Sequence, residues 1–233
     1  FTISFNLAKK RSTPVNGFEK QELETQGMMS RLFGSKPGHN ALVEINNFLA
    51  ESTAATELTE EIVSNFIKNW GAKFDSSNIE YRSSMYRKVA DHVYISAVSK
   101  DDPVFEETKH LAQVLELPEK LQRLADNGAK KVAYFSRCRK IISGEEPLTI
   151  SEINNVFGYD YEDGYDIRVQ VFHDYLNKKF DEIAEQQRFS PDEETALREI
   201  CTKLDIPYEF KPNIQNALDK YRYLWSAENA PLG

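Results

Sequence analysis

Residues 166–185 read DIRVQVFHDYLNKKFDEIAE, and apolar side chains recur in this stretch every three or four positions. This period places them on one stripe of an α-helix, while the charged residues between them occupy the other faces. The positions expected to face inward are Val169, Phe172, Leu176, Phe180 and Ile183. The stretch therefore predicts a long amphipathic helix, and it sets the period to look for in the rest of the chain.

The same helical period continues through most of the chain after Asn40. Apolar residues three or four positions apart lie on one helix face, so each such set predicts a buried stripe. The stripes are Leu42, Ile45, Phe48 and Leu49; Ile62, Phe66, Ile67 and Trp70; Met85, Val89, Val93 and Ala97; Leu197, Ile200 and Leu204; and Ile214, Leu218, Tyr221, Leu224 and Trp225.

Helix boundaries are also marked in the sequence. Thr149 with Glu152, and Ser190 with Glu193, have the spacing of capping boxes, in which two free amides at a helix start are satisfied. Gly71 is placed to end the helix that starts after Thr59, since glycine readily adopts the left-handed conformation of a C-cap. Prolines at 118 and 207 stop two further helices.

Two short sequence motifs, called landmarks below, each occur twice in the chain, and the separation between the two copies is nearly the same for both motifs. ELT at 57–59 matches PLT at 147–149, 90 residues later, and LELP at 115–118 matches LDIP at 204–207, 89 residues later. A shared offset with the same helix order predicts a tandem duplication. We therefore expect an all-α protein with two similar four-helix modules in tandem, a C-terminal helix and an irregular N-terminal arm.

The expected domain boundaries follow from these landmarks. The arm covers residues 1–38, where part of the segment before Met28 could be detached or not native, and FTISFNL at 1–7 could form a short strand. Module 1 covers 39–120, module 2 covers 121–210, and the C-terminal helix or linker covers 211–233. The tail resembles a linker that often leads to a second, β-rich domain, and with such a domain the chain would be a fragment.

Composition narrows the classes of function. The net charge is −8, of which residues 1–38 contribute +3 and the remainder −11, so the acidic body is not expected to bind nucleic acid. No apolar run is long enough to span a membrane, although the basic AKKR at 8–11 leaves peripheral membrane contact open. Cys138 and Cys201 are isolated in the sequence and predict small core residues of a cytoplasmic protein.

The acidic, aromatic stretch GYDYEDGYD at 158–166 is the first candidate site. It does not fit a calcium-binding EF-hand loop, because Tyr159 and Gln170 would fall at positions that require acids. One interpretation is a solvated connection with Asp166 as the N-cap of the next helix. The other is a recognition loop for a protein partner. Its contact residues would be Tyr159, Tyr161, Asp163 and Tyr165.

The stretches SGEEPLTISEINNVF at 143–157 and RFSPDEETALREI at 188–200 resemble the two acidic turns of the tellurite-resistance TerB-like helical family. The resemblance extends over residues 40–210. It implies a helical, soluble or peripherally membrane-associated protein that is linked to divalent-cation binding and to bacterial stress or phage-related assemblies. On this resemblance the metal ligands would be Glu146, Glu152, Asp192 and Glu193.

Three functions are therefore considered. The first is a non-enzymatic interaction or regulatory module that binds a protein partner and needs no certain cofactor. The second is a divalent-cation-binding module of the TerB-like kind. The third is a hydrolase, which would need His92 or His173 in a cleft with a carboxylate, or His92 and His110 meeting within one module. Because no catalytic motif is recognised in the sequence, the chain is expected not to be an enzyme.

Overall fold

The computed structural model describes residues 17–23 and 37–230. Within these residues all regular structure is helical and no β-strand occurs, which confirms the all-α prediction. The chain forms two compact units, Phe1–Ala133 and Tyr134–Gly233, which are called unit 1 and unit 2 below. No helix in the described part of the chain is long and apolar enough to cross a bilayer.

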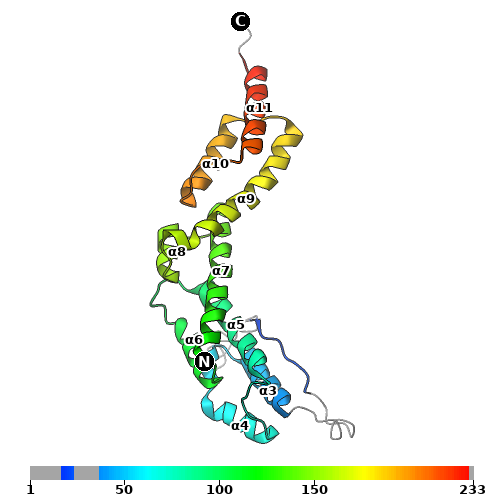
Figure 1. The fold of residues 1–233 in the computed structure, drawn as a ribbon, viewed down its shortest axis with the longest axis vertical. Helices are drawn as coiled ribbons and strands as arrows, with labels where there is room; N and C mark the ends of the chain where they lie inside the picture. Colours follow the sequence, from blue (N-terminus) through cyan, green and yellow to red (C-terminus); the bar gives the residue numbers. More distant parts are fainter. Residues whose placement is uncertain (1–16, 24–36, 231–233) are drawn as a thin grey trace, which may run out of the picture. The chain divides into compact units, whose positions relative to one another are not determined.

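Unit 1 is built from helices that follow one another through short connections (Figure 1). They are α3 (Pro37–Glu51), the 3₁₀-helix η2 (Ala55–Glu57), α4 (Glu60–Trp70), α5 (Ile79–Ser96), α6 (Phe105–Val114) and the first part of α7 (Glu119–Ser143). Helix α3 packs on α4 and α5, α5 packs on α6, and α6 packs on η2.

Unit 2 begins within α7 and continues through four further helices (Figure 1). They are α8 (Ile150–Phe157), α9 (Tyr161–Gln186), α10 (Pro191–Lys203) and α11 (Pro212–Glu228). Helix α9 contains the stretch at 166–185 and begins earlier than the apolar stripe alone indicated. The predicted boundary between residues 120 and 121 falls near the start of α7, which continues without interruption to Ser143.

The predicted helix boundaries are confirmed by hydrogen bonds. The Thr149 side chain accepts from the Glu152 amide while Glu152 accepts from the Thr149 amide at 2.8 Å. Ser190 and Glu193 make the same reciprocal pair, with the Ser190 amide donating to Glu193 at 2.7 Å. Gly71 ends α4 at φ 60°, a conformation that a side chain would strain.

The buried stripes are confirmed for α5 and α10 and hold only in part elsewhere. Met85, Val89, Val93 and Ala97 are at most 1% exposed, and Leu197, Ile200 and Leu204 are also buried. In contrast, the stripes of α4 and α11 are mostly half-buried. Val63 of α4 and Leu218 of α11 are their only fully buried side chains.

Several local features recur in the two units. Glu116 and Asp205, 89 residues apart, both have positive φ values, 47° and 53°, directly after α6 and α10. Arg82 and Arg168 are both buried, and each donates a hydrogen bond to the carbonyl seven residues before it. These matched features are what a duplication would leave behind, and the duplication itself stays a prediction.

Part of the predicted N-terminal arm belongs to the core of unit 1. Phe18 is fully buried, so residues 17–23 are not a detached segment. Asn46 of α3 donates to the carbonyl of Glu19 at 2.7 Å, and the amide of Gln21 donates to Asn47 at 2.7 Å. The strand predicted at 1–7 lies outside the described residues.

We expect Ser190→Ala to lower the free energy of unfolding by about 1 kcal/mol, because the Glu193 amide loses its acceptor at the start of α10. Urea-induced unfolding followed by circular dichroism measures the change. Thr195→Ala on the same helix is the matched control, since this exposed hydroxyl only bonds the Pro191 carbonyl within the helix. Equal losses for both variants would contradict a capping role for Ser190.

Candidate functional site

Most of the acidic, aromatic stretch belongs to the start of a helix, because α9 begins at Tyr161 and only residues 158–160 connect it to α8. Asp160, rather than Asp166, is the N-cap of α9, and its side chain accepts from the Asp163 amide at 3.0 Å. Asp163 in return accepts from the Asp160 amide at 3.0 Å. The interpretation with Asp166 as the N-cap is therefore wrong, because the Asp160–Asp163 spacing offers a capping box one turn earlier.

The tyrosines of this turn surround a buried arginine. Arg168 is fully buried, and its guanidinium carbon lies 4.5 Å from the Tyr161 ring centre and 5.7 Å from that of Tyr165. Its Nη2 donates to the Tyr161 carbonyl at 3.1 Å. No carboxylate of the described residues pairs with Arg168, and its Nε has no hydrogen-bond partner. The aromatic faces, the Tyr161 carbonyl and the Tyr134 hydroxyl therefore carry the stabilisation of this charge.

Tyr134 of α7 completes this tyrosine–arginine cluster, which we define as Tyr134, Tyr161, Tyr165 and Arg168. The Tyr134 hydroxyl accepts from Arg168 Nη1 at 3.0 Å and donates to Asn154 of α8 at 2.7 Å. Burial raises the pKa of Tyr134 to about 12, so the hydroxyl stays protonated and can play both roles at neutral pH. The cluster joins α7, α8 and α9.

The four predicted partner-binding residues differ in how much surface they offer. Asp163 is used in the cap, and Tyr159 packs on Tyr134 and Phe157. Tyr165 is half-buried against Tyr161, with ring centres 5.7 Å apart. Tyr161 is 44% exposed, although its hydroxyl donates to the Asp205 carbonyl. Of the three tyrosines, only Tyr161 therefore exposes a large aromatic surface to a partner.

Three of the four predicted metal ligands are held by separate local contacts. Glu146 is buried beside Arg137, with 3.8 Å between Nη1 and Oε1, and Glu152 and Glu193 serve as capping residues. Asp192 is exposed in the first turn of α10. In residues 17–23 and 37–230 no group of three or more His, Cys, Asp or Glu side chains is arranged to hold a metal ion. The cation-binding alternative stays a prediction.

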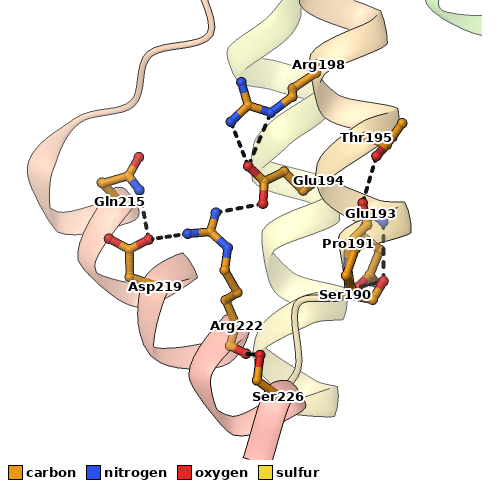
Figure 2. A network of polar contacts seen from close by, with 10 residues as sticks. All are labelled: Ser190, Pro191, Glu193, Glu194, Thr195, Arg198, Gln215, Asp219, Arg222 and Ser226. Carbon is orange, nitrogen blue, oxygen red and sulfur yellow. Dashed lines mark hydrogen bonds and ion pairs between the residues drawn. The ribbon is translucent and has the colours of Figure 1, made fainter. Parts of the chain in front are cut away.

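A polar network links α10 to α11 within unit 2 (Figure 2). Glu194 accepts from Arg198 at 2.7 Å and from Arg222 of α11 at 2.9 Å. Arg222 also pairs with Asp219 at 2.8 Å and lies over the Phe189 ring at 5.5 Å. The four charges are paired with one another, so the network explains how a half-buried α11 is held on α10 and does not form an open binding site.

The three histidines that a hydrolase could use lie on α5, α6 and α9. His110 Nε2 lies 2.7 Å from the Leu58 carbonyl, so this nitrogen is engaged within the fold. His92 and His173 are half-buried on α5 and α9. The hydrolase alternative stays a prediction.

A concave surface in unit 1 was not anticipated from the sequence. The α5–α7 groove has a volume of about 530 Å³ and is lined from α5 by Ile79, Ser83 and Arg87, and from α7 by Leu121, Leu124 and Ala125. Leu124 is 69% exposed, and Val132, two turns later on the same side of α7, is 51% exposed. At the far end Arg87 lies against Gly128, where an added Cβ would be 2.1 Å from Nη1.

In the first half of α7 small side chains are buried and two large apolar ones are exposed. Ala125, Ala129 and Ala133 are buried, whereas the larger Leu124 and Val132 face solvent. Alanine spacing of four residues was visible in the sequence, but an alanine stripe and a leucine stripe on neighbouring positions do not reveal which one is buried.

We expect Tyr134→Phe to destabilise unit 2 by about 2 kcal/mol, because Arg168 and Asn154 both lose a buried partner. In the Arg168→Met background the same change should cost about 1 kcal/mol, since only the Asn154 bond remains to be lost. A double-mutant cycle by urea-induced unfolding measures this coupling. Additive losses would show that Tyr134 and Arg168 do not interact.

Gly164→Ala should destabilise the chain by about 2 kcal/mol, although alanine normally favours a helix. An added Cβ would lie 2.4 Å from the Tyr134 hydroxyl oxygen and 2.5 Å from its Cζ, which are held in the core. Gly128→Ala is the control, because its Cβ would meet only the movable end of Arg87. Thermal unfolding compares the two, and equal melting temperatures would contradict the tight contact at Gly164.

Comparisons with protein-family models, curated proteins and solved structures give no match for this chain. The TerB-like resemblance, and with it a place in a stress or phage-related assembly, therefore stays a prediction from the two acidic turns.

Proposed function

We propose that this chain is a non-enzymatic interaction module that binds a protein partner, with the α5–α7 groove as its docking surface. The observation that carries the proposal is Leu124, a large apolar side chain that is 69% exposed at the rim of a concave groove. Single exposed apolar residues are common on protein surfaces. An exposed leucine beside a hollow lined by Ile79, Leu121 and Ala125 is instead the arrangement of an anchor next to a pocket.

The distribution of side chains on α7 supports the same function. Exchanging Leu124 for a polar residue would cost the fold little, because its side chain is mostly in water. A surface leucine therefore contributes little to folding and much to an interface, where its burial is worth about 2 kcal/mol.

Two further features complete the proposal. The proposed setting is the cytoplasm, which is supported by two free, buried thiols, Cys138 and Cys201. The exposed edge of Tyr161 is a second proposed contact for a partner, since tyrosine rings are enriched in protein interfaces.

Leu124→Asp should abolish recovery of a stoichiometric partner from extracts of cells that make this protein, because an aspartate cannot fill an apolar contact. The measurement is affinity capture with the wild-type chain, Leu124→Asp and a control variant at equal concentration. Cross-linked sites are identified by mass spectrometry. Val98→Asp is the matched control, since Val98 is also a solvent-facing apolar residue of unit 1, 63% exposed, and it does not line the groove.

The control should retain the partner, and the cross-links should fall on α5 and α7. A partner that binds Leu124→Asp as well as the wild-type chain would overturn the proposed docking surface. A substrate turned over by the purified chain would contradict a purely non-enzymatic role.

A further inference from the structure

We infer that the α5–α7 groove accepts an acidic amphipathic helix from the protein partner. The inference rests on the proposed function and adds the chemical class of the partner.

The shape of the groove favours a helix. Ile79, Ser83 and Arg87, which line the groove on α5, are spaced by four residues, so the groove follows one side of α5 for about 12 Å, or two helical turns. A partner helix can place apolar residues at positions i, i+3, i+4 and i+7 along such a line. An extended peptide would need a free strand edge for its backbone hydrogen bonds, and the described residues of unit 1 contain no strand.

The charges along the outer edge of α7 favour an acidic partner. Lys120 and Lys131 are exposed and form no ion pair with any described residue. The two acids of this part of α7 do not offset them: Glu119 is paired with Arg123, and Asp126 accepts from the buried Tyr86 hydroxyl at 2.9 Å. A helix seated over Leu124 would therefore meet unpaired positive charge along one flank.

The opposite flank of the groove, on α5, is nearly neutral. Arg87 is paired with Asp91 at 2.6 Å, and Ser83 and Ser84 are uncharged. Glu80 is the one acid that lines the groove. Complementary charge is therefore expected on only one flank of the partner helix, which fixes its orientation about its own axis.

Other occupants fit this surface less well. A second copy of the chain docked through α7 would bring Lys120 and Lys131 against like charges. The N-terminal residues 1–16 carry Lys9, Lys10 and Arg11 and no acid, so they have the same sign as the groove edge. A bilayer surface would attract the lysines but is too flat to fill a hollow of about 530 Å³.

The test uses the full chain and a fluorescein-labelled designed peptide of about 18 residues, five helical turns, with leucines on one face and glutamates on the flanks. A second peptide has lysine in place of each glutamate. Fluorescence anisotropy should show saturable binding of the acidic peptide that weakens as salt is raised. Leu124→Asp should weaken it by at least about tenfold, and Val98→Asp should leave it unchanged.

A charge exchange tests the class of partner. The double variant Lys120→Glu/Lys131→Glu should bind the acidic peptide about tenfold more weakly and the lysine peptide about tenfold more tightly than the wild-type chain does. Lys68→Glu/Lys100→Glu makes the same change in net charge elsewhere on unit 1 and should leave both affinities unchanged. Equal effects of the two double variants would overturn the inference, since only overall charge would then matter.

Four further results would overturn it in favour of another occupant or of none. They are no binding of the acidic peptide by the folded chain, dimerisation that Leu124→Asp abolishes, peptide binding that requires deletion of residues 1–16, and Leu124-dependent binding to phosphatidylcholine–phosphatidylserine vesicles. If the captured partner depends on Leu124 while the acidic peptide fails to bind, the partner class is wrong and the proposed function stands. If capture does not depend on Leu124, the proposed function itself fails.

Discussion

A buried guanidinium must find acceptors within the protein, and this constraint ties together the ends of helices in both units. Arg82 donates to the carbonyls of Asp75, Leu115 and Glu116, so it joins the start of α5 to the end of α6. Arg168 joins the first turn of α9 to α7 through Tyr134. An arginine without these acceptors would leave a charge in the core at a cost of several kcal/mol. The geometry of the helix ends is therefore fixed by two side chains as well as by apolar packing.

Much of the helical fold could be predicted from the sequence, because the signals involved are local. The Thr149–Glu152 and Ser190–Glu193 pairs depend on residues three positions apart, and both form as predicted. The apolar period of α5 is set by side chains of one helix, and all four residues of its predicted stripe are buried. Local spacing was sufficient wherever a contact lies within one helix turn.

The prediction was weaker where a contact joins distant parts of the chain. The tyrosines at 159–165 were interpreted as surface residues because their composition is that of a turn. Arg168, which organises two of them, lies in the buried face of a helix whose charged residues were all expected outside. Its main acceptor, Tyr134, is 34 residues earlier. No local pattern signals that a buried charge will be satisfied by a distant hydroxyl. The α5–α7 groove could not be predicted for the same reason, because it is lined by two helices that are distant in the sequence.

The first half of α7 shows how a core contact can create a surface. Its buried face consists of Ala125, Ala129 and Ala133, so α7 can approach its neighbours closely and needs no large side chain there. A helix that packs through alanines leaves its larger residues beside the contact and not within it. Leu124 then lines the hollow beside Ala125 of the same helix, and Val132 is exposed two turns further along. The small side chain of Ala125 leaves room between α5 and α7, and the leucine beside it offers an apolar surface to whatever occupies that room.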